Sequence, residues 1–347
     1  MLFWGVYVVF LAALCVGGFR LYWKVKFGVP VTTSATVWDF YFPEIRTAGV
    51  LEADIHAGDQ YIDVLMLGAS TIEANWGNIE KLLYETLRTE FGDKVRVFNL
   101  AVVAHTSRDS ALKATYLADK AFDVVLVYDG INDSRMNNCP DEFFRADYTH
   151  CTRYRSFEKR KTSASLILPP DLQQSVYETI GLGVPDPPFL QFGAKLKTPG
   201  PFRSNFQTIL AAARRHKSLV VLNTFATHIP DDYSDEKLKS GKLDFAYKAG
   251  ASRCPLHMWG QQDHVVAAVR AHNAVISELA AHDPDGVVFV DQQALLSGDG
   301  KNFIDVCHFS DAGCERFVAN LMNELIPRLR TRLGSWATTA PPPTAWM

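Results

Sequence analysis

The segment YIDVLMLGAST, residues 61–71, combines a short apolar run with a glycine and, two residues later, a serine. Apolar runs of this length that end at glycine are typical of strands buried on both faces of a sheet. Four similar apolar runs follow along the chain, at residues 95–98, 123–128, 219–223 and 287–290. We therefore predict about five buried strands.

Helical patterns alternate with these runs, at residues 77–90, 107–120, 261–281 and 311–331. Strands that alternate with helices form right-handed crossovers and a parallel sheet covered on both faces. The predicted fold is α/β, a three-layer doubly wound (flavodoxin-like) parallel sheet of about five strands. Ligands of such sheets bind beyond the carboxyl ends of the strands, where the strand order reverses.

The 347 residues correspond to about two domains of roughly 150 residues, or to one α/β domain with insertions. The Pro-rich segment 134–217 has no clear strand pattern, and we predict that it is an insertion or lid over the strand ends. Residues 25–59 would lead into a domain that covers residues 60–332, and residues 333–347 would be a disordered tail.

The composition excludes several classes of protein. Hydrophobic residues make up 48% and charged residues 21%, which is incompatible with wholesale disorder. The net charge of −3 provides no basic field for nucleic acid, so we expect no nucleic-acid partner. Six cysteines without a C-x-x-C pair argue against a zinc ribbon, and the sequence implies no metal or cofactor. A disulfide between Cys139 and Cys151 stays open, as does the oligomeric state.

An uncharged and mostly apolar stretch covers residues 2–19, followed by Arg20, Lys24 and Lys26. Eighteen helical residues rise about 27 Å, close to the roughly 30 Å hydrocarbon core of a bilayer. We predict a transmembrane anchor in residues 1–24, with the lipid bilayer contacted through residues 2–23. A cleaved signal peptide is the alternative, although no basic region precedes the apolar run. The basic flank favours a cytoplasmic domain, whereas the substrates considered below favour the envelope face.

Four polar motifs lie at predicted strand ends or in the last loop. They are Gly68-Ala69-Ser70-Thr71, the loop from Asn99 to Thr106, Gly130-Ile131-Asn132-Asp133, and Asp305-Val306-Cys307-His308. An Asp three residues before a His can bind its Nδ1 and leave Nε2 to accept a proton from a serine. Because the carboxyl ends of parallel strands share one edge, the motifs together suit acyl transfer.

In order, spacing and strand context, these motifs resemble those of the SGNH, or GDSL-type, hydrolases. The resemblance covers roughly residues 60–135 and 285–330. It implies that Ser70 is the nucleophile, His308 the general base, and Asp305 the residue that orients His308.

The same resemblance implies an oxyanion hole formed by the backbone N–H of Ser70, the side-chain amide of Asn132, and the backbone N–H of Ala104. The family usually has glycine at the position of Ala104. Alanine supplies the same N–H, provided that the backbone conformation does not require glycine. The family's Gly-Asp-Ser is Gly-Ala-Ser here, which affects the turn rather than the triad.

The implied function is that of a membrane-anchored serine esterase that removes small acyl groups, such as acetyl, from a carbohydrate or envelope polymer. An O-acyltransferase of the same fold is the alternative within this chemistry, and a catalytically inactive binding or scaffold relative is the alternative outside it. Candidate substrate contacts near the strand ends are His105, Asp133, His228 and Trp259.

Overall fold

The computed structural model describes residues 2–162, 187–247 and 250–339. The chain divides into two compact units. One contains Met1–Asp54 and Pro140–Val184, and the other contains Ile55–Cys139 and Pro185–Met347.

The larger unit is built on a five-stranded sheet in which every neighbouring pair of strands is parallel. The strand order is β2-β1-β3-β4-β5, with β1 (Ile62–Gly68), β2 (Val95–Asn99), β3 (Val124–Tyr128), β4 (Leu219–Asn223) and β5 (Val287–Val290). The prediction of a doubly wound parallel sheet is confirmed. The order reverses direction between β1 and β3, which makes their carboxyl ends the expected ligand site.

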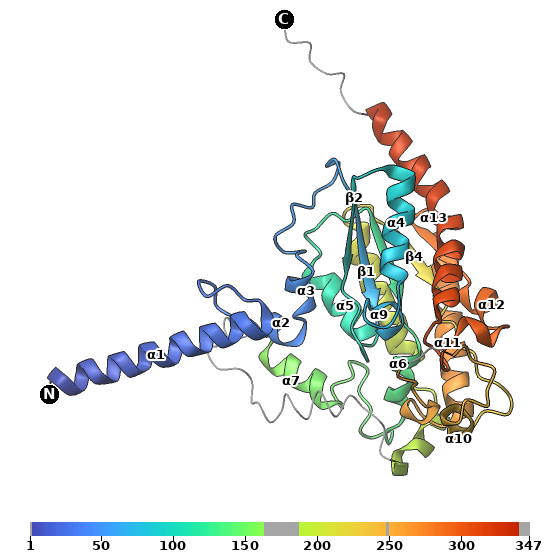
Figure 1. Ribbon diagram of the computed structural model, residues 1–347, viewed down its shortest axis with the longest axis horizontal. Helices are drawn as coiled ribbons and strands as arrows, with labels where there is room; N and C mark the ends of the chain where they lie inside the picture. Colours follow the sequence, from blue (N-terminus) through green and yellow to red (C-terminus); the bar gives the residue numbers. More distant parts are fainter. Residues whose placement is uncertain (1, 163–186, 248–249, 340–347) are drawn as a thin grey trace, which may run out of the picture. The chain divides into compact units, whose positions relative to one another are not determined.

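Helices cover both faces of this sheet (Figure 1). The long ones are α4 (Ile79–Phe91), α5 (Ser107–Tyr116), α9 (Pro199–Arg214), α11 (Gln262–Ala281) and α13 (Asp311–Thr339). Helix α4 packs against α13, and α9 packs against both α5 and α11. Since the crossovers before and after β2 run in opposite directions, right-handed connections put α4 and α5 on opposite faces.

Short helices occupy the connections of this unit. They are α6 (Ile131–Ser134), α10 (Asp235–Lys239) and α12 (Gln292–Leu296), with 3₁₀ segments at η1 (Ser70–Ile72), η2 (Arg135–Asn137), η3 (Pro187–Ala194), η4 (Leu256–Met258) and η5 (Gly300–Asn302).

Two predicted boundaries are corrected by the structure. Helix α9 lies within the predicted insertion 134–217, yet it is the crossover helix between β3 and β4. Pro199 and Pro201 concealed it in the sequence, because proline suggests a break but is tolerated in the first turn of a helix. Helix α13 extends to Thr339, so the predicted tail 333–347 begins too early, and residues 340–347 lie outside the described part.

The smaller unit contains α1 (Leu2–Phe27), α2 (Val37–Tyr41), α3 (Glu44–Thr47) and α7 (Thr152–Arg160). Phe157 of α7 packs edge-on against Trp38 and Phe42, with ring centroids 5.1 and 5.5 Å apart. The predicted linker 25–59 is therefore structured over much of its length, through contacts with a segment more than a hundred residues later. Cys139 and Cys151 are present as thiols.

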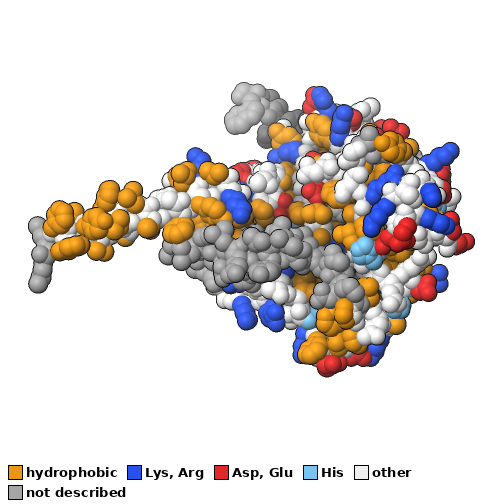
Figure 2. All heavy atoms as spheres, turned by 60° about the horizontal axis from the view of Figure 1, so that its bottom comes forward, with side chains coloured by type: hydrophobic (Ala, Val, Ile, Leu, Met, Phe, Trp, Pro, Cys, Tyr) orange, Lys and Arg blue, Asp and Glu red, His pale blue; other side chains and the backbone are white. Residues whose placement is uncertain are grey.

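Helix α1 is long and apolar enough, over Phe3–Phe27, to cross a membrane. Its outer part presents apolar side chains, as Figure 2 shows, and Phe3 and Trp4 are 78% and 69% exposed. Trp23 differs, because it is 3% exposed and packs against Phe27 and Phe40. The predicted bilayer segment 2–23 thus includes, at its end, a residue of the protein interior.

Candidate active site

The turn after β1 brings Ser70 to the carboxyl end of the sheet's central region. A Cβ atom on Gly68 would lie 2.7 Å from the carbonyl oxygen of Tyr128 and 2.8 Å from Cδ1 of Ile72, so only glycine fits there. Ser70 begins η1 directly afterwards and is 7% exposed. The sequence motif therefore reflects a close approach of the turn to β3.

His308 lies opposite Ser70, although 238 residues separate them along the chain. The Ser70 hydroxyl lies 2.8 Å from Nε2 of His308. On the other side of the ring, Nδ1 lies 2.8 Å from Oδ2 of Asp305. Because a carboxylate only accepts hydrogen bonds, this contact places the proton on Nδ1 and leaves Nε2 to accept from Ser70.

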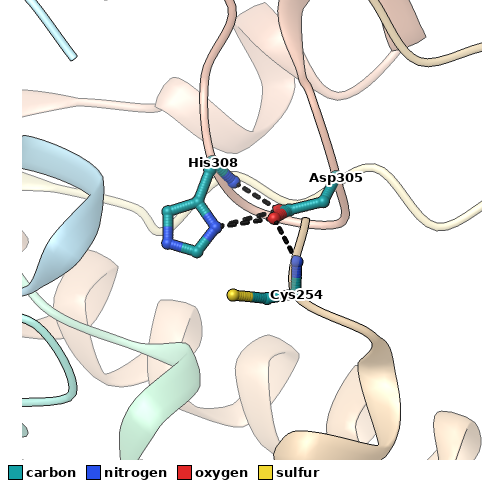
Figure 3. Close-up of side chains that lie close together, drawn as sticks. All are labelled: Cys254, Asp305 and His308. Carbon is teal, nitrogen blue, oxygen red and sulfur yellow. Dashed lines mark hydrogen bonds and ion pairs between the residues drawn. The ribbon is translucent and has the colours of Figure 1, made fainter. Parts of the chain in front are cut away.

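Asp305 is fully buried and receives several hydrogen bonds (Figure 3). Oδ1 accepts from the backbone N–H of Cys307 and of His308, at 3.0 and 2.9 Å, and Oδ2 accepts from the backbone N–H of Cys254 at 2.9 Å. Burial by itself raises the pKa of Asp305, but His308 and these N–H groups outweigh it and lower the pKa. The carboxylate therefore stays ionised beside the imidazole.

The indole ring of Trp76 stacks on the face of the His308 imidazole. The two ring centroids lie 4.1 Å apart with an interplanar angle of 20°. This contact restricts rotation of the imidazole and covers one side of it. Sequence reasoning missed Trp76, which stands between the serine turn and α4 without any pattern of its own.

The loop between β2 and α5 forms a turn in which the N–H of His105 donates to the carbonyl of Val102. Ala104, the third residue of that turn, has φ +63°. A positive φ at this position favours glycine, which is the residue the family usually has there. The chain thus holds alanine in the left-handed conformation and still presents its N–H at the turn.

Asn132 on α6 is held in one orientation by its neighbours. Its Oδ1 accepts a hydrogen bond from Nε1 of Trp259 at 2.8 Å and another from Arg135. Its Nδ2 donates to the carbonyl oxygen of His105 at 2.8 Å. Since an amide nitrogen has two protons, a second N–H of Asn132 is available for a ligand.

Three donors can therefore serve a developing oxyanion. Within the described residues, the backbone N–H groups of Ser70 and Ala104 donate to no protein acceptor, and Asn132 supplies the third N–H. Preorganised donors of this kind stabilise the charge of a tetrahedral intermediate. The structure brings Ser70, His308 and Asp305 into one hydrogen-bonded array and joins Asn132 to the loop that carries Ala104.

The candidate substrate contacts His105 and Asp133 have protein partners instead. The His105 ring is 4% exposed, with Nδ1 2.9 Å from Nζ of Lys113. Asp133 is fully buried and accepts from both the backbone N–H and the hydroxyl of Ser107, at 2.9 and 2.5 Å. Asp133 thus ties α6 to the start of α5, and the ring of His105 is held by Lys113.

His228 and Trp259 also have partners within the protein. The ring nitrogens of His228 lie 2.9 Å from the carbonyl oxygen of Ser297 and 2.9 Å from the carboxylate of Asp244. Trp259 is 2% exposed, and its N–H is used by Asn132. Trp259 therefore orients the side-chain amide of Asn132, a contact that its place in the sequence does not reveal.

Cys254, Asp305 and His308 could in principle hold a metal ion, because one ligand atom from each lies within 4.8 Å of the others (Figure 3). Burial, followed by the charge of Asp305, raises the pKa of the Cys254 thiol to about 12, and a protonated thiol is a poor ligand. Burial also raises the pKa of Cys307 well above its usual value. The hydrogen bonds described above account for the Asp305 carboxylate and the His308 ring, and neither thiol is activated as a nucleophile.

Comparison with known proteins finds similarity at the level of solved structures. No family model and no curated protein matches the chain. A GDSL-like lipase from Bacteroides thetaiotaomicron has a TM-score of 0.47 and 12% identity, covering 84% of this chain and 99% of that one.

Two further structures are similar over slightly less of the chain. The lipase/acylhydrolase from Enterococcus faecalis has a TM-score of 0.39 and 16% identity, covering 77% of this chain and 96% of that one. An acetyl xylan esterase has a TM-score of 0.39 and 12% identity, covering 76% and 100%. The solved structures that this chain resembles thus include lipases and acylhydrolases of the GDSL type.

Proposed function

We propose that the chain is a serine ester hydrolase of the SGNH type, with Ser70, His308 and Asp305 as its catalytic triad. The observation that carries this proposal is the continuous hydrogen-bonded array from the Ser70 hydroxyl through both nitrogens of His308 to Asp305. Its members are buried, and an acceptor beside a hydroxyl with a carboxylate behind it is the arrangement that acyl transfer requires.

The reaction follows from these contacts. As Oγ of Ser70 attacks an ester carbonyl, Nε2 of His308 takes its proton, and the resulting oxyanion accepts hydrogen bonds from Ser70, Ala104 and Asn132. Collapse of this intermediate breaks the bond to the alcohol, which leaves with the proton from His308. Water then attacks the acyl-enzyme with His308 again as base, and releases the carboxylic acid and Ser70.

We propose a small acyl group, such as acetyl, as the part that is removed, and a carbohydrate or envelope polymer as the carrier. The exposed fractions of Ser70 and His308, 7% and 2%, favour a small acyl group over a long chain. We propose further that α1 anchors the protein in a membrane, because its outer part is apolar and exposed.

A fluorophosphonate probe tests the nucleophile directly. It should label the wild-type protein at Ser70 and should not label Ser70→Ala. With p-nitrophenyl acetate, the wild type should release a burst of nitrophenol that Ser70→Ala lacks. Esterase activity that survives in Ser70→Ala would disprove the assignment, and an unlabelled but folded wild type would favour a binding protein without catalysis.

The remaining parts of the proposal need separate measurements. Addition of a glycan acceptor to the nitrophenyl acetate assay distinguishes hydrolysis from transfer, because only an acyltransferase gives an acetylated glycan. Carbonate extraction of membranes from cells that express the full chain tests anchoring. Release into the supernatant would contradict it, and protease accessibility of retained protein would identify the face of the bilayer.

A further inference from the structure

Lys113 is a fully buried lysine on α5, next to the loop that carries Ala104. Lysine is almost never fully buried unless its ammonium group is paired. Here Nζ donates to the carbonyl oxygen of Leu100 at 2.5 Å and to Nδ1 of His105 at 2.9 Å. Two of the contacts that hold Lys113 are therefore with one loop.

These two partners stand at either end of the loop 100–105, which contains the strained turn Val102–His105. Leu100 directly follows β2, and His105 directly follows Ala104, whose φ is +63°. A left-handed alanine persists only where the surrounding structure holds it. Lys113 connects both ends of this loop, Leu100 and His105, to α5. It thereby opposes relaxation of Ala104 to an ordinary backbone conformation.

The second oxyanion donor is attached to the same residue. The carbonyl oxygen of His105 accepts the hydrogen bond from Nδ2 of Asn132, while the ring of His105 accepts from Lys113. Movement of His105 would therefore displace the N–H of Ala104 and the amide of Asn132 together.

We propose that Lys113 is a positioning residue for the oxyanion hole, which acts through the backbone of Ala104 and through His105 and Asn132. This inference rests on the proposed function. It assigns Lys113 no contact with the substrate, and it predicts loss of transition-state binding without loss of ground-state binding.

Lys113→Met tests this, since methionine fills much of the space and cannot donate. Loss of one oxyanion donor lowers kcat by about 10²–10³-fold, so a displaced donor should lower it by roughly 10–100-fold. KM for p-nitrophenyl acetate should change little, since ground-state contacts remain. The affinity for phenylboronic acid, which forms a tetrahedral adduct on the serine, should fall in proportion to kcat.

Leu117→Ala is the matched control, because Leu117 directly follows the same helix as its C-cap and is 2% exposed. It should lower the free energy of unfolding without changing kcat or boronate affinity of the folded protein. Equal boronate affinity in the wild type and Lys113→Met would overturn the inference.

A second pair of variants decides the question if Lys113→Met does not fold. In His105→Asn, Oδ1 replaces Nδ1 as an acceptor for Lys113, whereas His105→Leu removes the acceptor at similar size. We expect His105→Asn to retain most of the wild-type kcat and boronate affinity, and His105→Leu to lose both in parallel. Indistinguishable variants would refute the inference. A wild type that binds neither boronate nor fluorophosphonate would instead refute the proposed function.

Discussion

Replacement of Asp305 by asparagine changes one atom of the triad, and the structure indicates which way the new amide turns. If NH₂ occupied the place of Oδ1, it would face two backbone N–H donors, those of Cys307 and His308. In the place of Oδ2 it faces one backbone donor, that of Cys254, and Nδ1 of His308. The second orientation leaves fewer donors without an acceptor.

That orientation inactivates the base. An NH₂ group at 2.8 Å from Nδ1, nearer than the remaining carbonyl oxygen at 3.0 Å, favours a ring that accepts at Nδ1 and carries its proton on Nε2. Nε2 then cannot accept the proton of Ser70, and kcat should fall on the order of 10⁴-fold. The N–H of Cys254 loses its acceptor, which costs about 1–3 kcal/mol of stability.

The assay is the kcat for p-nitrophenyl acetate at neutral pH, with urea unfolding measured in parallel. Asp123→Asn is the control, because Asp123 is also buried but accepts from the N–H of Asp63 at the opposite, amino end of the strands. Its kcat should equal that of the wild type. A folded Asp305→Asn whose kcat falls less than about tenfold would refute the assignment of Asp305 as the group that sets the tautomer.

Three further outcomes follow from individual contacts. Trp259→Phe removes the N–H that orients Asn132. Because such a hydrogen bond is worth about 0.5–1.5 kcal/mol, kcat should be roughly 3–10-fold lower at similar KM. An unchanged kcat would show that the hydrogen bond from Arg135 is enough to orient Asn132. Ala104→Gly should keep the wild-type kcat, because glycine adopts φ +63° readily, whereas Ala104→Val should lose activity. Steady-state kinetics that rank the two variants otherwise would contradict the strained turn. Burial lowers the pKa of His272 to about 3, below its unfolded value near 6.5, so the unfolded chain binds the extra proton between these pH values. The free energy of unfolding should therefore decrease as pH falls through this window, by up to about 1.4 kcal/mol per pH unit. In His272→Gln, urea unfolding at a series of pH values should show a weaker dependence of this free energy on pH. An equal dependence in the wild type and the variant would be the contrary result.

Much of the fold could be predicted because its signals are local. The apolar runs that became β1, β3 and β4 are buried along their whole length, as the absence of alternation in the sequence indicates. Helix α9 was not predicted, because its first turn contains two prolines. The structure within residues 25–59 was not predicted, because the helix it packs against, α7, lies far along the chain.

The residues of the site likewise include some that local motifs predict and others that only tertiary contacts reveal. Ser70, Asn132, Asp305 and His308 could be assigned because each belongs to a short motif at a predicted strand end. Trp76, Trp259 and Lys113 belong to no motif and act through contacts with other residues. His105, Asp133 and His228 were expected to contact substrate because they lie near the right edge, but proximity to an edge does not specify where a side chain points.

By itself, the amino-acid sequence determined the order of strands and helices and the residue types available for acyl transfer, because hydrophobic periodicity and turn chemistry act over a few neighbouring residues. The tertiary structure alone decided which groups hold those residues in place. The contact between Trp259 and Asn132 joins residues 127 positions apart, and no local pattern encodes it. Such contacts form only when distant segments pack at one edge of the sheet, where a buried polar group without a partner is costly.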